Sequence, residues 1–225
     1  MKVMGLIPAL DAEDTVGLVV TGTLRYLERV VVVDDGRTDG TAEAARKAGA
    51  EVISHGRNLG KGAALKTGFE YVLKEGCDAV VTLDADTQHD PTEIPKLIEA
   101  SKGGAGIVVG CRLKDRGEIP PARYYTNMVG VKCFSFMSRN TLEDSQSGFR
   151  LYTAGVLKGM KYASSGFETE SELLIRAGRR GFKIANVPVK AIYDEQILSK
   201  SHFRAVRDTY RICILFLRSF FWFNP

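Results

Sequence analysis

The chain has 225 residues, of which 44% are hydrophobic and 26% are charged. That length and mixture predict one large α/β domain with its own buried core, and they exclude wholesale disorder. The 31 basic and 27 acidic side chains leave a net charge of +4, which is too small to indicate a nucleic-acid-binding protein.

Strand and helix patterns alternate through the first half of the chain. Short apolar or β-branched runs predict strands at 3–7, 30–33, 51–54, 79–83 and 107–110. Helical periodicity is weak between the first two strands, and clearer patterns predict helices over 42–48, 61–74 and 91–101. This alternation favours an α/β fold with a mostly parallel sheet and helices on both faces.

The second half of the chain is less regular. Its patterns predict, in order, a loop that leads into a helix, a turn, a helix and a strand, over 112–135, 147–151, 167–180 and 184–189. We expect a single domain over residues 1–198, followed by a C-terminal segment over 199–225.

Polar residues and turn formers follow the predicted strands. They are Pro8, Asp34, Asp35, Asp84, Asp86, Cys111 and Arg112. Ligands of parallel sheets bind beyond the carboxyl ends of the strands, so these residues predict where the functional site lies.

Two familiar nucleotide-binding loops are excluded. The glycine pattern of a dinucleotide fold is missing after the first strand, where the chain reads Gly5-Leu6-Ile7-Pro8. The segment 56–62 resembles a P-loop, but it is one residue short between glycines, and Gly62 replaces the Ser or Thr that would hold Mg²⁺.

The segment Thr82-Leu83-Asp84-Ala85-Asp86-Thr87-Gln88-His89-Asp90 is the sharpest candidate for a metal site. In extended backbone, residues two apart point to the same side, so Asp84 and Asp86 can face one cation, with Gln88 next. Oxygen ligands completed by substrate phosphates suit Mg²⁺ or Mn²⁺. The alternative is a solvated acidic turn that caps the helix starting at Pro91.

Six segments in chain order resemble glycosyltransferase family 2, and most closely its dolichyl- or polyprenyl-phosphate sugar transferases. They are 8–10 (PAL), 31–36 (VVVDDG) with 38–41 (TDGT), 58–64 (NLGKGAA), 84–89 (DADTQH), 110–112 (GCR) and 147–150 (SGFR). The resemblance spans about residues 2–201 and implies a GT-A (Rossmann-like) fold, a nucleotide-sugar donor and inversion at the anomeric carbon.

The resemblance also implies a role for individual residues. The metal would be held by Asp84, Asp86 and Gln88. The nucleotide sugar would be bound by Pro8, Leu10, Glu13, Val33, Asp35, Lys61, Asp84, Ala85, Asp86 and Lys200. The acceptor phosphate would be received by Arg112, Arg123 and Asn127, and the residues expected to carry catalysis are Asp86, Arg112 and Arg123.

The identity of the acceptor decides whether the reaction needs a base. A sugar hydroxyl must lose a proton, and Glu143 or Asp144 are the candidates to take it. A lipid monophosphate is already anionic near neutral pH, so positioning by Arg112 and Arg123 is sufficient. We favour transfer of mannose or glucose to dolichyl or polyprenyl phosphate. A hydroxyl-directed transferase and a non-catalytic nucleotide-sugar-binding scaffold are the alternatives, the latter because the motifs depart from the family at Leu10 and Gln196.

The excess positive charge lies in the C-terminal segment. Residues 199–225 contain five basic side chains and one acidic one, whereas 1–198 are balanced. As a helix, this segment places its basic groups in a sector of roughly 60°, with apolar and aromatic residues mostly opposite. That pattern is typical of a helix lying in a membrane interface, and the alternative is a helix packed on the core or on a partner subunit.

The same residues indicate the cellular location. The N-terminus does not have the pattern of a signal peptide, the four cysteines form no CxxC pair, and no apolar run is long enough to span a bilayer. We therefore expect a cytoplasmic protein bound peripherally to the cytoplasmic face of a membrane.

Overall fold

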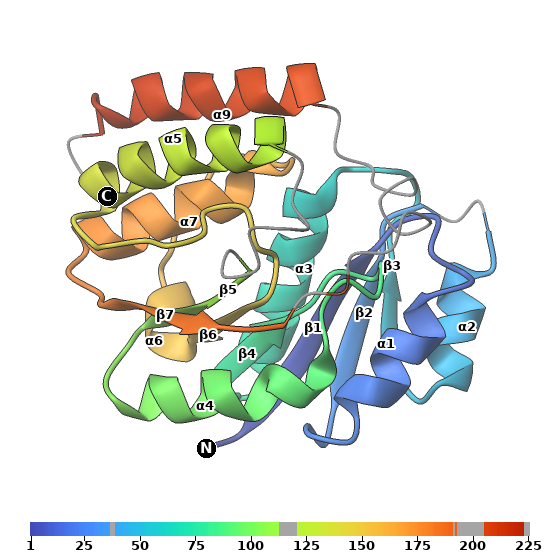
Figure 1. Ribbon diagram of the computed structural model, residues 1–225. Coiled ribbons are helices and arrows are strands. Elements are labelled where there is room, and N and C mark those ends of the chain that lie inside the picture. The colour runs from blue at the N-terminus through green and yellow to red at the C-terminus, as the bar shows by residue number, and fades with distance from the viewer. Residues whose placement is uncertain (37–38, 113–120, 191, 193–204, 223–225) are drawn as a thin grey trace.

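A seven-stranded sheet forms the centre of the computed structural model (Figure 1). Residues 1–36, 39–112, 121–190, 192 and 205–222 are described, without the side chains of 121–129, 205, 206, 208 and 209. The strands are β1 (Val3–Ala9), β2 (Val30–Asp34), β3 (Glu51–Ser54), β4 (Ala79–Thr82), β5 (Ile107–Cys111), β6 (Arg150–Thr153) and β7 (Ile184–Pro188).

The sheet is mostly parallel, as the sequence predicts. Its order is β3-β2-β1-β4-β6-β5-β7, and only β6 runs antiparallel to its neighbours β4 and β5. The strands are rich in Val and Ile, and five of them are buried on both faces, which is typical of a sheet covered by helices.

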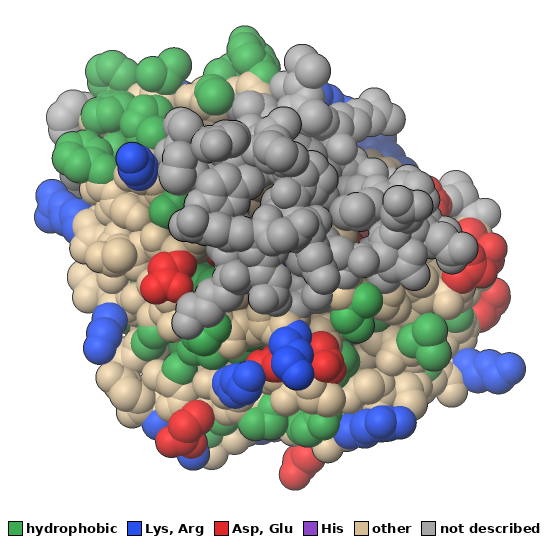
Figure 2. Space-filling view, in the orientation of Figure 1, with side chains coloured by type: hydrophobic (Ala, Val, Ile, Leu, Met, Phe, Trp, Pro, Cys, Tyr) green, Lys and Arg blue, Asp and Glu red, His purple; other side chains and the backbone are tan. Residues whose placement is uncertain are grey.

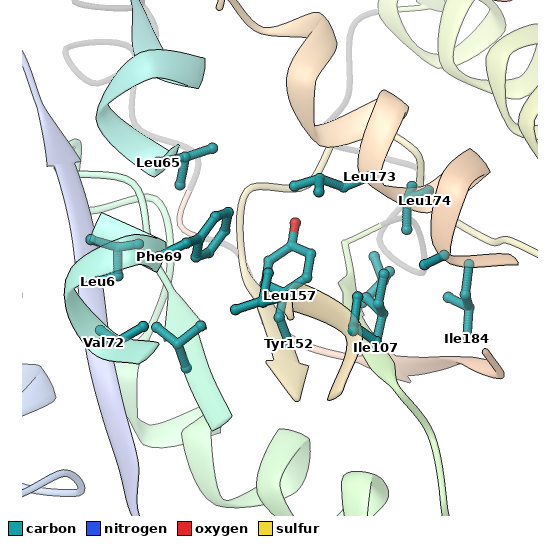
Figure 3. Close-up of a cluster of buried hydrophobic side chains, with 14 of the residues drawn as sticks. Leu6, Leu65, Phe69, Val72, Ile107, Tyr152, Leu157, Leu173, Leu174 and Ile184 are labelled. Atoms are coloured by element: carbon teal, nitrogen blue, oxygen red, sulfur yellow. The ribbon is translucent and has the colours of Figure 1, made fainter. Parts of the chain in front are cut away.

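Helices cover the two faces unequally. They are α1 (Val16–Thr23), α2 (Thr41–Lys47), α3 (Lys61–Lys74), α4 (Ile94–Lys102), α5 (Pro121–Ser138), α6 (Ala154–Leu157), α7 (Glu168–Arg179) and α9 (Ala205–Ser219), with a short 3-10 turn at Pro91–Glu93. One hydrophobic cluster joins α1, α2 and α4 to the sheet, and another joins α3, α5, α6 and α7 to the opposite face. Figure 3 shows the second cluster, in which Phe69 of α3 meets Tyr152 of β6 edge-on with 5.3 Å between ring centroids.

The region around β6 differs from the expectation. The predicted turn at 147–151 includes the start of β6, and α6 follows that strand directly. An antiparallel strand needs no crossover helix before it, so the alternation of strands and helices gives no sign of β6. The helix expected at the end of the 112–135 segment is confirmed as α5, which begins at Pro121.

The C-terminal helix α9 lies across α5 and α7 (Figure 1). Leu215 and Ser219 are buried there, and Ile212, Phe216 and Trp222 pack against the core cluster. The expected boundary between 198 and 199 lies outside the described residues. No helix in the described part of the chain is both long enough and apolar enough to cross a membrane.

Candidate functional site

An ion-pair network lies beyond the carboxyl end of β4. Lys61, the first residue of α3, places its Nζ 2.7 Å from Asp84 Oδ1 and 2.9 Å from Glu170 Oε2. Asp84 follows β4 after Leu83, and Glu170 lies in the first turn of α7. The network therefore ties together three elements that are distant in sequence, at the edge of the sheet where the sequence predicts the site.

The charges in this network stabilise one another strongly. Burial alone would lower the pKa of Lys61, but Asp84 and Glu170 outweigh it and hold that pKa well above its usual range. Burial alone would raise the pKa of Asp84, but Lys61 and His89 hold it well below its usual range. Both groups are therefore charged at neutral pH, and each depends on the other for compensation.

The pKa of Asp86 is shifted in the opposite direction from that of Asp84. Burial and the charge of Asp84 raise the pKa of Asp86. Its Oδ1 accepts a hydrogen bond of 3.0 Å from the Gln88 backbone N–H, and Oδ2 has no donor within the described ranges. Within the described residues, no basic side chain forms an ion pair with Asp86, the second carboxylate of the predicted metal site.

The donor set fits a hard divalent cation that is shared with a substrate. Nowhere in the described ranges are three His, Cys, Asp or Glu side chains placed to hold a metal ion. Two carboxylates and the buried Gln88 amide would leave positions for phosphate oxygens, which is how Mg²⁺ is commonly bound. The unfavourable charge of Asp86 beside Asp84 is what a cation there would relieve.

His89 lies behind Asp84. The ring is buried, its Nε2 lies 3.4 Å from Asp84 Oδ2, and it packs against Phe149 with 5.3 Å between ring centroids. Its Nδ1 is buried without a hydrogen-bond partner in the described residues. His89 therefore contacts one oxygen of Asp84, and Lys61 contacts the other.

The turn before β6 closes against Asp84. A Cβ at Gly148 would stand 2.7 Å from Asp84 Cγ, so only glycine fits there. Thr82 Oγ1 donates a 2.8 Å hydrogen bond to the carbonyl of Gly148. The fully buried Arg150 donates to the carbonyls of Ser145, Ser147 and Glu170, which joins this turn to α7.

Asp35 organises the loop that precedes Lys61. Its carboxylate is buried and accepts hydrogen bonds from the Leu59 N–H at 3.0 Å and the Gly60 N–H at 2.7 Å. His55 Nδ1 lies 2.6 Å from Asp35 Oδ1, and His55 Nε2 lies 2.9 Å from Thr67 Oγ1. These contacts show a structural task for Asp35, and its expected contact with a nucleoside stays a prediction.

The other expected nucleotide contacts gather on β1 and β2. Pro8 and Val33 are partners in the register of these neighbouring strands, and both are buried. Leu10 is half-buried just beyond β1, and the exposed Glu13 accepts a 2.8 Å hydrogen bond from the Gly40 N–H. Ala85 is buried between the two aspartates. Lys200 lies outside the described residues.

Arg112 and Asp144 form a second ion pair beyond β5. Arg112 Nε donates to Asp144 Oδ2 at 3.0 Å, and the N–H groups of Gln146 and Ser147 donate to Oδ1 at 2.9 and 3.1 Å. Burial would raise the pKa of Asp144, but Arg112 and these hydrogen bonds lower it to about 2. Glu143, the other candidate base, is exposed. Arg123 and Asn127 belong to α5, but their side chains lie outside the description.

The low pKa of Asp144 predicts a pH dependence of stability. A carboxylate whose pKa is about 2 in the folded state, against an ordinary 3.8, stabilises the fold above about pH 4 and loses that contribution as the pH falls towards 2. At 1.36 kcal/mol per pKa unit, the contribution is about 2 kcal/mol. In urea titrations, the stability difference between wild type and Asp144→Asn should shrink over that pH range. A difference that is independent of pH would contradict this assignment.

Sequence reasoning missed Glu170, Arg150 and His55. Glu170 belongs to a helix whose pattern only predicts one amphipathic face, and Arg150 closes the Ser147-Gly148-Phe149-Arg150 motif without any signal that it is buried. The polar residues that follow the predicted strands identified Asp84, Asp86 and Arg112, and no comparable signal marked Glu170, Arg150 or His55.

Comparisons with known proteins agree on one family. The model described as "Glycosyl transferase family 2" matches residues 6–162. The chain is 30% identical to the UDP-N-acetylglucosamine–dolichyl-phosphate N-acetylglucosaminyltransferase of Methanococcus voltae, with 87% of each chain covered. It is also 30% identical to the undecaprenyl-phosphate mannosyltransferase of Micrococcus luteus, with 87% of this chain and 85% of that one covered.

Solved structures share the fold. The glucosyl-3-phosphoglycerate synthase of Mycobacterium tuberculosis, crystallised with Mn²⁺, UDP and glucosyl-3-phosphoglycerate, superimposes with a TM-score of 0.74 at 22% identity. The alignment covers 97% of this chain and 79% of that one.

Proposed function

The chain belongs to glycosyl transferase family 2 and has its GT-A fold, and from that premise we propose that it moves mannose or glucose from a nucleotide-diphosphate sugar to dolichyl or polyprenyl phosphate, with inversion at the anomeric carbon. The pair Asp84 and Asp86 at the carboxyl edge of the sheet, in which Lys61 holds Asp84, is the observation that carries the proposal. Relatives named as polyprenyl-phosphate sugar transferases support the choice of acceptor.

Asp84, Asp86 and Gln88 would hold Mg²⁺ or Mn²⁺. A metal bound there would neutralise charge on the departing diphosphate. Lys61 adds a positive charge at the same edge and keeps Asp84 in place. Pro8, Leu10, Glu13, Val33, Asp35, Ala85 and Lys200 remain the proposed nucleotide-sugar contacts.

The state of Asp144 supports a phosphate acceptor. With a pKa of about 2 and Arg112 on its carboxylate, Asp144 is too weak a base to take a proton from a sugar hydroxyl. A lipid monophosphate needs no such step, because its oxygen is already anionic near neutral pH. We assign Arg112, Arg123 and Asn127 to its phosphate group, with Arg112 held in position by Asp144.

A panel of donors and acceptors tests this function. GDP- and UDP-linked mannose, glucose and N-acetylglucosamine are incubated with a short polyprenyl phosphate and either Mg²⁺ or Mn²⁺. We expect one hexose donor to give a lipid-linked product whose formation stops with EDTA. Transfer to glycan hydroxyls alone would replace this proposal with a hydroxyl-directed transferase. Binding of a donor without turnover would replace it with a non-catalytic scaffold.

A lipid acceptor requires contact with a membrane, and the outer face of α5 and α9 suits that contact. Figure 2 shows hydrophobic side chains gathered over these helices. Phe136 is 73% exposed, Leu217 is 61% exposed and Phe221 is 74% exposed. The exposed Arg207 and Arg218 lie on the same helix α9. Apolar and basic groups together match an anionic bilayer surface, so we place the protein peripherally on the cytoplasmic face of a membrane.

Removing the two exposed arginines of α9 should weaken vesicle binding. Each basic residue near an anionic surface contributes about 1 kcal/mol, so Arg207→Gln with Arg218→Gln should lower partitioning about 30-fold. Sedimentation with phosphatidylserine-containing vesicles measures the effect. The matched control is Arg25→Gln with Arg46→Gln, two exposed arginines in the α1–α2 part of the molecule. Equal loss in both double variants would contradict a specific α9 surface.

A further inference from the structure

A backbone contact fixes the start of α3, where Lys61 lies. The carbonyl of Ser165 accepts hydrogen bonds from the Gly62 N–H at 2.8 Å and the Ala63 N–H at 3.2 Å. A Cβ at Gly62 would stand 2.7 Å from the Ser165 carbonyl carbon, so the two segments touch without room for a methyl group. The position of Lys61 therefore depends on the loop 163–165.

A buried carboxylate of α7 holds that loop. Glu172 Oε2 accepts hydrogen bonds from the Ser164 N–H at 3.0 Å and the Ala163 N–H at 3.2 Å, and also from the Ser164 hydroxyl. The opposite oxygen, Oε1, pairs with Arg176 Nε at 2.7 Å. Glu172 is 1% exposed, so its charge is compensated by these neighbours and hardly at all by water.

Arg176 in turn stacks on the tryptophan that follows α9. Its guanidinium carbon lies 4.0 Å from the centre of the Trp222 ring, a geometry in which the ring face attracts the cation. The backbone N–H of Trp222 donates a hydrogen bond to the carbonyl of Ser219, which also accepts one from Arg179 Nη1 at 2.5 Å. Trp222 is thus held by α7 on its inner side, whereas Phe221 beside it is exposed.

We propose that Trp222 is a positioning residue for the diphosphate site. Its ring fixes Arg176, Arg176 fixes Glu172, and Glu172 fixes the loop 163–165 that carries the start of α3. Lys61 and, through it, Asp84 are then held in the geometry that receives the donor. The role assigned to Lys61 rests on the proposed function, but the chain of contacts does not.

The two sides of the C-terminal helix α9 would then have different tasks. The outer side presents exposed apolar and basic groups for a bilayer, and the inner side ends in a contact that leads to the catalytic edge of the sheet. Loss of the inner contact should therefore impair the donor site even when no membrane is present. If Trp222 only packs against α7, its loss should lower the global stability of the fold without a separate effect on the donor site.

Amide hydrogen exchange tests the contact chain directly. In Trp222→Ala, the amides of Gly62, Ala63 and Ser164 should exchange about tenfold faster, while those of α1 and β2 stay unchanged. Trp222→Phe keeps an aromatic face under Arg176 and should restore most of the protection. Phe182→Leu is the matched control, because Arg180 of the same helix end stacks on Phe182 but hydrogen-bonds to the carbonyls of Val156 and Lys158 instead of the loop.

Steady-state kinetics with a short polyprenyl phosphate and no vesicles form the second readout. Trp222→Ala should raise the KM for the donor about tenfold while leaving the acceptor KM unchanged, and Phe182→Leu should change neither. Two results in Trp222→Ala would overturn the inference. One is a uniform rise in amide exchange across all elements, and the other is exchange at Gly62 and Ala63 that stays as slow as in wild type. If no donor is turned over by wild type but the local exchange change is present, the proposed function fails and the contact chain stands.

Arg176→Lys covers the case in which Trp222→Ala does not fold. Lysine keeps the charge beside Glu172 but lacks the flat group that stacks on the ring. It should give the same local rise in exchange at Gly62 and Ala63. Exchange identical to wild type would show that the stack transmits nothing to the loop.

Discussion

Replacing Lys61 by methionine is expected to lower the free energy of unfolding by about 3 kcal/mol at neutral pH. The substitution leaves Asp84 and Glu170 close together and without their shared cation. Breaking a buried ion pair costs about 3–5 kcal/mol, and the lower end applies because Asp84 keeps 24% of its side chain exposed to screening water. Urea titration monitored by circular dichroism measures the change.

The pH dependence of that loss identifies its cause. Lys61 holds the pKa of Asp84 below its usual range, so without Lys61 the Asp84 carboxyl takes up a proton more readily as the pH falls below about 4, and the penalty for removing Lys61 should shrink. Lys66→Met, an exposed lysine on the same helix, should change stability by less than about 0.5 kcal/mol. A Lys61→Met penalty that is equally large at low pH would point to lost packing instead of uncompensated charge.

The strands and helices of the fold were predictable where the chain alternates regularly. The helix α3 matches its predicted bounds 61–74, and the patterns of β1 to β5 lie within two residues of the observed strands. Insertion of β6 between β4 and β5 was not predictable, because a strand of four residues after a turn carries no periodicity that separates it from a loop.

The candidate site divides in a similar way. Asp84 and Asp86 could be found because a strand end and a spacing of two place them together by local geometry. The ion-pair network around them could not be predicted, because Lys61 and Glu170 approach Asp84 only when α3 and α7 pack on the sheet. The burial of Asp144 against Arg112 likewise depends on how the loop before β6 folds back on β5.

Replacing Asp86 by alanine is expected to reduce transfer at least 1000-fold. In the proposed reaction this carboxylate holds the metal that neutralises the departing diphosphate. Loss of about 4 kcal/mol of that stabilisation corresponds to a factor of about 1000 in rate. Product formation with the preferred donor and a short polyprenyl phosphate, measured at saturating Mn²⁺, gives the value.

The same variant should fold at least as stably as wild type. The pKa of Asp86 is raised in the folded state, so its charge at neutral pH opposes folding, and alanine removes that charge from beside Asp84. Asp90→Ala, which removes the carboxylate that caps the turn at Pro91, should show the reverse pattern of lower stability and nearly full turnover. Mn²⁺ binding followed by electron paramagnetic resonance should disappear in Asp86→Ala and persist in Asp90→Ala. A folded Asp86→Ala protein with near-normal turnover would remove Asp86 from the metal site and leave the acidic segment as a helix cap.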